Sequence, residues 1–343
     1  MRGGPGPAQP GNVYTRDDFI TLLGEAFHPG QVCRPADVAV GRDVYRLLWV
    51  QGRGWAPETT FVDYHEPVAQ LEGWAARSPW PRGPQGQRLR RLRRLRPASL
   101  GLVPVTQWPG ELDPRAALGA PVVVWSDFPD WESYLALLQA RRVLPEDMRR
   151  RRRLEDAAGP LCFTVDDTAD DVLPTCFDWK TRRDREAGRP ELFADPAPRH
   201  FFEMLRARGL LRASTLRGDG RLLSVWLGSV HQGRWSGWVF AFNPDPVLAR
   251  YSPGRQLLYP MLRESWDAGH REFDFSIGLE PYKLSFASHV RVLGTAGSRP
   301  AGERLAALAR RLFGRHPRVL EALRALRRGR FVRPSRPQPE PRS

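Results

Sequence analysis

Three apolar runs follow one another over residues 210–242, and short turn signals separate them. Gly218-Asp219-Gly220 follows the first run and Gln232-Gly233 follows the second, so the pattern predicts three antiparallel strands joined by tight turns. The second and third runs are apolar at consecutive positions, which indicates a sheet covered on both faces. We expect the strands at 210–216, 222–230 and 235–242.

A helix and a further strand follow this meander. The helix, which Gly269 ends, is predicted from the helical spacing of Leu257, Leu258, Met261, Leu262 and Trp266. Phe273 and Phe275 then alternate with Glu272 and Asp274, so we expect the aromatic side chains on the buried face of a strand and the carboxylates on the other face. The order strand, helix, strand predicts a parallel crossover attached to the meander.

The remaining elements are predicted from the same two periodicities. Helices are expected from Thr15 onward and at 131–143, 172–186 and 200–209. Strands are expected at 44–50, 59–64, 100–105, 121–125, 161–165 and 290–293. We place a domain boundary near residue 155. The expected parts are a disordered lead at 1–12, a first domain at 13–155, a second domain at 156–297 and a basic amphipathic or disordered tail at 298–343.

The charge is strongly basic but uneven, with 53 basic and 38 acidic residues and a formal net charge of +15. Residues 301–343 alone contain twelve Arg and three Glu, so the expected domains are only mildly basic. The five arginines of Arg149–Arg153 predict a solvated or disordered stretch. Arg88–Arg96 predicts a basic surface helix, with nucleic-acid binding as the alternative. The tail helices are expected to dock on the protein or to contact an anionic membrane surface.

Cysteine and histidine patterns bear on disulfide and metal sites. Cys33, Cys162 and Cys176 show no CxxC spacing, and the seven histidines show no HxxxH or HExxH spacing. We therefore expect neither a disulfide framework nor a metal. No apolar run approaches the ~18 residues that span a bilayer, and the first residues lack the apolar core of a signal peptide. The expected location is the cytosol, with peripheral contact at the inner membrane surface through the basic tail.

Candidate chemistry lies where the Phe273–Phe275 strand ends. Glu280, Tyr282 and Lys283 follow it, and an acid, a phenol and an amine in a loop at a strand end are a common arrangement for catalysis. Lys180 and Lys283 are the only lysines of the chain, and a lysine can change its protonation state on burial whereas arginine stays charged. The alternative is a strand exit with solvated charges or a structural ion pair.

A second candidate feature is Ser252-Pro253-Gly254, which opens the predicted helix. A helix N-terminus exposes N–H groups and a partial positive charge, so it suits phosphate or pyrophosphate. Gly254 would let the backbone approach a ligand closely and Arg255 would add a charge, with Gln256 in the same expected binding set. The alternative is ordinary capping by Ser252, with Pro253 in the first turn.

Together, the meander, the Ser-Pro-Gly helix start and the strand leading to Glu280-Pro281-Tyr282-Lys283 resemble the GNAT-type N-acyltransferase domain of the CelD-like (cellulose-biosynthesis-protein-like) family, which is related to the Fem-type peptidyltransferases. The resemblance covers roughly residues 125–293. It implies an α/β (α+β) fold of two GNAT-like halves. Each half would be a mixed, mostly antiparallel sheet flanked by helices, and the N-terminal half would be degenerate.

The same resemblance implies acyl-CoA, most simply acetyl-CoA, as the donor and an amine or amino sugar as the acceptor, with polysaccharide or envelope synthesis as the setting. An attacking amine needs a base, for which Glu280 is the candidate and Asp274 the runner-up. Tyr282 would protonate the leaving thiolate. Lys283 would hold the donor's phosphate, orient an acidic acceptor or pair with Glu280.

Two alternatives to an acyl-CoA enzyme stay open. One is a Fem-like transferase that uses an aminoacyl-tRNA donor, which the basic segments would suit. The other is a catalytically decayed nucleic-acid-binding or scaffold protein. Ile277 and Leu279 stand where the family pattern has an Arg and an Asp, and this departure bears on both activity and choice of substrate.

Overall fold

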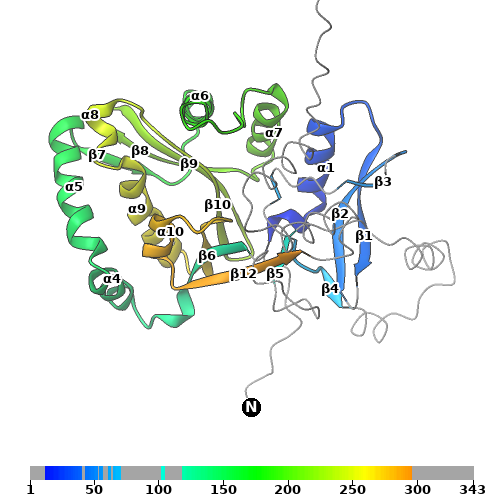
Figure 1. Ribbon diagram of the computed structural model, residues 1–343, viewed down its shortest axis with the longest axis horizontal. Helices are drawn as coiled ribbons and strands as arrows, with labels where there is room; N and C mark the ends of the chain where they lie inside the picture. Colours follow the sequence, from blue (N-terminus) through cyan, green and yellow to red (C-terminus); the bar gives the residue numbers. More distant parts are fainter. Residues whose placement is uncertain are drawn as a thin grey trace, which may run out of the picture. The chain divides into compact units, whose positions relative to one another are not determined.

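The computed structural model describes residues 12–40, 43–52, 54–56, 61–62, 65–70, 102–104 and 118–295 (Figure 1). The predictions for the lead before Asn12, for the basic segment 88–96 and for the tail at 298–343 lie outside the described residues.

The larger sheet has eight strands in the order β5-β12-β6-β11-β10-β9-β8-β7. Neighbouring strands are antiparallel except β10 and β11, which are parallel. With helices beside it, this mixed and mostly antiparallel sheet confirms the predicted fold class, and the parallel pair confirms the predicted crossover. The strands are β5 (Leu102–Pro104), β6 (Leu118–Val124), β7 (Leu161–Thr164), β8 (Arg212–Gly218), β9 (Arg221–His231), β10 (Arg234–Phe242), β11 (Glu272–Asp274) and β12 (His289–Thr295).

The two turns of the meander follow from local backbone chemistry. Asp219 and Gly220 have φ of 46° and 76°, and Gln232 and Gly233 have φ of 47° and 74°. Two successive positive φ values match the right-handed twist of the flanking strands in a two-residue hairpin. The strands β8, β9 and β10 are therefore joined as the sequence predicts.

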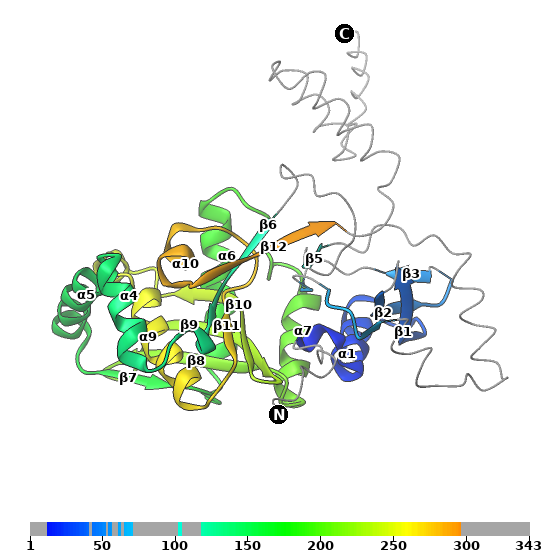
Figure 2. The ribbon, with the colours of Figure 1, turned by 90° about the horizontal axis from the view of Figure 1, so that it is seen from below.

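Helices cover both faces of the meander (Figures 1 and 2). Val225 and Leu227 of β9 pack in one core with the first helix layer, while Trp226 between them packs in a second core with the other layer. Alternate side chains of one strand thus serve both layers, which confirms the expectation of a doubly covered sheet. The first layer is α6 (Val172–Glu186) and α7 (Pro196–Ala207), and the second is α4 (Trp131–Ala140), α5 (Val143–Ala158) and α9 (Pro253–Asp267).

The five arginines at 149–153 lie within α5, so the stretch is helical and not disordered, while Arg149, Arg152 and Arg153 are exposed as the solvated alternative predicts. Val143, Leu154 and Ala158 are buried along one side of this helix and anchor it to the core. Arg151 pairs with Glu155 at 3.2 Å, one turn further on, and Arg150 pairs with Glu146. Buried apolar residues outside the run and ion pairs at four-residue spacing support the helix.

The N-terminal part forms a smaller, four-stranded antiparallel sheet. The helix beside this sheet, α1 (Asp17–Phe27), packs against α7 of the first helix layer, where the ring centroids of Phe19 and Phe201 lie 5.5 Å apart. β2 confirms the strand predicted at 44–50, whereas Phe61 and Val62, the described part of the strand predicted at 59–64, lie outside strands. The elements are η1 (Val13–Thr15), α1 (Asp17–Phe27), β1 (Cys33–Val40), β2 (Asp43–Val50), β3 (Gly54–Ala56) and β4 (Ala69–Gln70).

The expected boundary near residue 155 falls inside α5, between β6 and β7. Both of these strands belong to the larger sheet, and β6 lies between β11 and β12. The sheet therefore contains residues from both sides of that boundary. The division into two GNAT-like halves stays a prediction.

Candidate functional site

The parallel strands β10 and β11 stay together over only three residue pairs. Arg234–Ser236 pairs with Glu272–Asp274, after which β11 ends and β10 continues to Phe242 beyond an irregularity between Gly237 and Val239. The chain leaves β11 through Ser276 and Gly278, with φ of 66° and 113°, and enters the short helix α10 (Pro281–Phe286). The pairing of the two strands thus ends at Ser236 and Asp274, and the chain reaches α10 after a short connection.

Tyr282 and Lys283 lie on α10 rather than in a loop, and Glu280 directly precedes this helix. Pro281 is its first residue, a position where proline's missing N–H costs nothing. The helix places residues 280 and 283 on one face, because side chains three apart are neighbours.

Lys283 is buried and makes two contacts. Its Nζ donates to the carbonyl oxygen of Ile277 at 2.7 Å and lies 3.0 Å from Oε2 of Glu280. The lysine side chain is 8% exposed and the Glu280 side chain 52% exposed. The ammonium therefore holds the turn after β11 from within, and the carboxylate presents its other side to solvent.

Tyr282 lies beside aromatic residues at the end of β10. Its ring centroid is 6.3 Å from that of Phe240. Burial raises the pKa of Tyr282, the nearby charge of Glu280 raises it further, and Arg183 opposes both. The phenol therefore keeps its proton at neutral pH.

Arg183 of α6 lies against the same aromatic residues as Tyr282 and was not among the predicted site residues. Its guanidinium lies 4.8 Å from the ring centroid of Phe242 and 5.7 Å from that of Phe240. The side chain reaches solvent, yet enough protein surrounds the guanidinium that burial lowers the pKa of Arg183, with Arg189 adding to the effect. Its position four residues after Trp179, on the same face of the predicted helix, is the signal that could have indicated it.

Asp274, the runner-up base, lies in a different environment. It is buried, accepts a hydrogen bond from the N–H of Ser276 at 2.8 Å and pairs with Arg291 at 2.8 Å. Glu272 is also buried and pairs with Arg291 and Arg234. The alternation placed these carboxylates opposite the phenylalanines but did not predict their burial, which follows because two arginines reach them inside the protein.

The start of α9 approaches the same aromatic group. A Cβ atom added to Gly254 would lie 1.8 Å from the ring of Phe240, so glycine is required for the ring to pack there. Ser252 has a left-handed φ of 57°, and its hydroxyl accepts a hydrogen bond from Arg150 at 3.2 Å instead of capping the helix. Phe240 thus contacts both the first turn of α9 and Tyr282.

Arg255 and Gln256 point to α5 instead. Arg255 pairs with the buried carboxylate of Asp147 at 2.6 Å, and Gln256 donates to the Asp147 carbonyl oxygen at 3.2 Å. Tyr259 donates to the same carboxylate at 2.9 Å. These side chains join α9 to α5, and the guanidinium of Arg255 also lies 5.2 Å from the ring centroid of Phe286 in α10.

Lys180, the other lysine, is also engaged within its own helix. It pairs with the buried Asp184, which Arg189 also contacts at 3.0 Å.

Within the part of the chain that the structure describes, no group of three or more His, Cys, Asp or Glu could hold a metal ion. None of the described helices combines the length and the hydropathy needed to cross a membrane.

Comparison with solved structures finds distant likenesses. The C-terminal domain of a lysylphosphatidylglycerol synthetase from Agrobacterium fabrum is 15% identical, with a TM-score of 0.49, and the match covers 88% of this chain and 94% of that one. FemX is 11% identical, with a TM-score of 0.47 and coverages of 84% and 93%. L-PGS from Bacillus licheniformis is 10% identical, with a TM-score of 0.46 and coverages of 87% and 93%. Likenesses at this level say nothing about the substrate.

Comparison with protein families is more direct, although no curated protein matches the chain. Residues 141–284 match the model of the acetyltransferase (GNAT) domain. This range begins at the end of α4, includes the meander, α9 and β11, and ends within α10. The narrower resemblance to the CelD-like family stays a prediction. The matched segment, which is less than half of the chain, is therefore similar to a GNAT-type acetyltransferase domain.

Proposed function

We propose that the chain is an N-acyltransferase that moves an acyl group from acyl-CoA, most simply acetyl-CoA, to an amine. The observation that supports this proposal is that Tyr282 and Arg183 both lie against Phe240, and that the charge of Glu280 is near enough to raise the pKa of each, beyond the point where the pairing of β10 and β11 ends. An exposed carboxylate, a protonated phenol and a cation at one strand end are the groups that acyl transfer to an amine requires.

In this proposal the amine nitrogen attacks the thioester carbonyl carbon and Glu280 accepts the proton that the amine loses. The C–S bond then breaks, and the thiolate leaves as Tyr282 donates a hydrogen bond to the sulfur. Tyr282 suits this role because its raised pKa keeps the phenol protonated. Lys283 acts as a positioning residue, since its contacts fix the Glu280 carboxylate and the Ile277 carbonyl.

The donor's phosphates would lie at the first turn of α9, where backbone N–H groups and the helix dipole favour anions. We assign this role to the backbone around Ser252 and Gly254, with Arg183 as the nearby cation. Arg255 and Gln256 belong to the expected binding set, and their contacts with Asp147 support a role in holding α9 in place.

An acyl-transfer assay tests this proposal. The protein is incubated with acetyl-CoA and with longer acyl-CoAs, in the presence of amines, amino sugars and amino acids, and the release of CoA thiol is measured. Acetyl-dependent thiol release that needs an amine supports the proposal. The proposal includes an envelope or polysaccharide precursor as the acceptor, which the acceptor panel tests. It also includes a cytosolic site of action.

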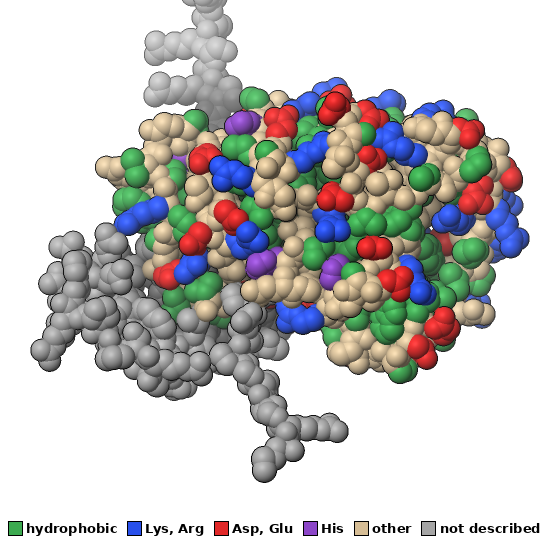
Figure 3. Space-filling model, turned by 180° about the vertical axis from the view of Figure 1, so that it is seen from behind, with side chains coloured by type: hydrophobic (Ala, Val, Ile, Leu, Met, Phe, Trp, Pro, Cys, Tyr) green, Lys and Arg blue, Asp and Glu red, His purple; other side chains and the backbone are tan. Residues whose placement is uncertain are grey.

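The aminoacyl-tRNA donor stays the second candidate because of one feature. Arg149, Arg152 and Arg153 are exposed on α5, next to α9, and such a basic helix suits a nucleic acid. On the face in Figure 3, by contrast, acidic and basic side chains are interspersed. Binding of tRNA through these arginines would weaken by orders of magnitude as salt rises, whereas binding of CoA would change far less.

A further inference from the structure

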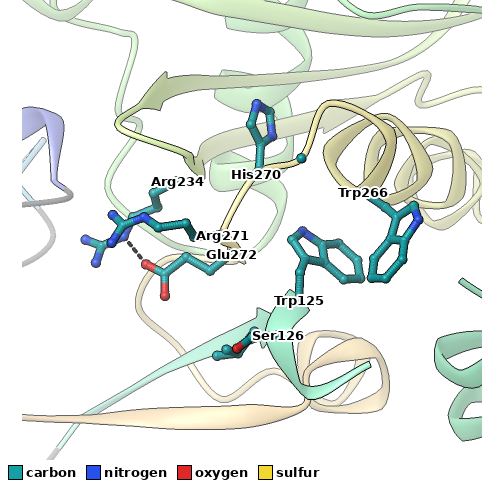
Figure 4. A pocket seen from close by; sticks show the side chains of 9 residues that line it. Trp125, Ser126, Arg234, Trp266, His270, Arg271 and Glu272 are labelled. Atoms are coloured by element: carbon teal, nitrogen blue, oxygen red, sulfur yellow. Dashed lines mark hydrogen bonds and ion pairs between the residues drawn. The ribbon is translucent and has the colours of Figure 1, made fainter. Parts of the chain in front are cut away.

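A cavity of about 650 Å³ lies at the amino ends of β10 and β11, whereas the proposed acyl-transfer site lies at their carboxyl ends (Figure 4). Its size is in the range that small-molecule sites occupy. None of its lining residues takes part in the proposed reaction. They come from the end of β6 and the short helix η3 (Trp125–Asp127) after it, from the end of α9 and the turn that follows it, and from the starts of β10 and β11. They include Trp125, Trp266, Arg234, His270, Arg271 and Glu272.

The walls of this cavity are tied to one another by hydrogen bonds. Ser265 is fully buried, and its hydroxyl accepts from Nε1 of Trp125 at 2.9 Å and lies 3.2 Å from Nδ1 of His270. The N–H of Trp125 donates to the carbonyl oxygen of Arg271 at 3.0 Å. Three separate elements are thus held in one arrangement, as a preformed binding site requires.

One side of the cavity is aromatic. The rings of Trp125 and Trp266 meet edge to face, with centroids 5.7 Å apart, and Trp266 is only partly buried. His270 follows in the turn after α9; its imidazole points away from these two rings in Figure 4 and lies 5.9 Å from the ring centroid of Trp235. Burial lowers the pKa of His270, and the nearby positive charge of Arg212 lowers it further, so the imidazole stays neutral at pH 7. The two indole rings suit the flat face of a ligand ring.

The other side carries the charges. Glu272 is neutralised by Arg234 and by Arg291, and Arg234 also pairs with Glu66 at 2.9 Å. Arg271 differs from them, because Nε donates to the carbonyl oxygen of Gln232 at 3.0 Å and no described carboxylate lies within ion-pair distance of it. The guanidinium is therefore oriented by a backbone group, and its positive charge is available to a ligand.

We propose that this cavity is a second ligand site, which takes a small anionic molecule with a flat ring, of the size of a nucleoside monophosphate. The ring lies against Trp266 and the anionic group pairs with Arg271. The site is separate from the acyl-transfer centre and does not depend on that activity.

Calorimetry with three probes tests the proposal on the whole protein. AMP carries a ring and an anion, adenosine carries the ring alone, and ribose 5-phosphate carries the anion alone. We expect saturable binding of AMP, with each fragment bound at least about tenfold more weakly. No saturable binding of AMP at millimolar concentration, or equal binding of AMP and adenosine, would overturn the proposal.

Variants assign the binding to the cavity. Arg271→Gln and Trp266→Leu should each weaken AMP binding about tenfold or more, while Arg208→Gln, an exposed arginine at the end of α7, should leave it unchanged. Arg271 is exposed, so its replacement tests the proposal even if Trp266→Leu unfolds the protein. If AMP binding survives Arg271→Gln and is lost in Arg183→Gln, AMP binds at the acyl-transfer site and the proposal is wrong. Acyl transfer should be unchanged in Arg271→Gln, so the two proposals can fail separately.

Discussion

Lys283 and Glu280 form an ion pair of 3.0 Å in which the ammonium is buried and the carboxylate is half exposed. In the proposed reaction the carboxylate accepts a proton from the amine, and the ammonium holds the carboxylate in position. Both variants Glu280→Gln and Lys283→Ala should therefore lower kcat roughly a hundredfold or more, since a general base contributes on that scale. The measurement is the rate of acyl transfer, with circular dichroism as the test of folding.

Glu203→Gln is the matched control, because Glu203 is exposed on α7, outside the site. It should keep the full rate. If Glu280→Gln is folded and also turns over like the parent, Glu280 is not the base. Lys283→Arg separates positioning from charge alone, since the longer guanidinium keeps the charge and disturbs the contact with Ile277.

Gly254 and Phe240 are in contact at the start of α9, which gives a prediction on stability. A methyl group at residue 254 would overlap the Phe240 ring, so Gly254→Ala should destabilise the protein by about 2 kcal/mol. Chemical unfolding measures the change. The double variant Gly254→Ala with Phe240→Leu should recover part of the loss, because the smaller side chain removes the overlap. A single variant as stable as the parent would contradict this packing.

A variant at Arg255 tests whether this side chain holds α9 against α5 or binds the acyl donor. The Asp147 carboxylate is 1% exposed and would lose its charged partner in Arg255→Gln. We expect a loss of about 3 kcal/mol in the free energy of unfolding, as for other broken buried pairs, with little change in CoA affinity. Unchanged stability together with much weaker CoA binding would instead assign Arg255 to the donor site.

His65 makes stability depend on pH. Burial lowers its pKa from 6.5 to about 4, and none of the described residues supplies a hydrogen-bond partner to its Nε2. Between these values the unfolded chain binds a proton that the folded protein does not, so stability falls as the pH drops below 6.5. From neutral pH to about pH 5 the expected loss is about 2 kcal/mol.

Urea unfolding at the two pH values measures this loss in the parent and in His65→Gln. The variant should lose less stability on acidification than the parent does. His200→Gln is the control, because His200 is exposed on α7 and its removal should not change the difference between the two pH values. An equal loss in all three proteins would show that other groups cause the pH dependence.

The meander, the crossover and several helices could be predicted because their signals are local. The helix predicted at 172–186 has the bounds of α6, and the strand predicted at 235–242 overlaps β10 almost completely. Alternation, turn residues and helical spacing each depend on a few neighbouring residues, so one sequence is enough to read them.

The environment of the candidate site could not be predicted, because it depends on contacts between distant residues. Arg291 pairs with Asp274, 17 residues away in the sequence, and Arg234 pairs with Glu272, 38 residues away. These contacts allow the carboxylates to be buried, which the alternation alone does not predict. Asp147 reaches Arg255 across 108 residues. The type of each side chain was visible in the sequence, but its partner was decided by the folded sheet and helices.

The place of β6 between β11 and β12 has a consequence for how the chain can be divided. A fragment that starts at residue 156 would lack β6, so the facing edges of β11 and β12 would lose their hydrogen-bond partners. Such a fragment would recruit an added strand. Two separately produced pieces, 1–155 and 156–343, are therefore expected to associate on mixing, because the first piece supplies the strand that pairs with both β11 and β12 of the second.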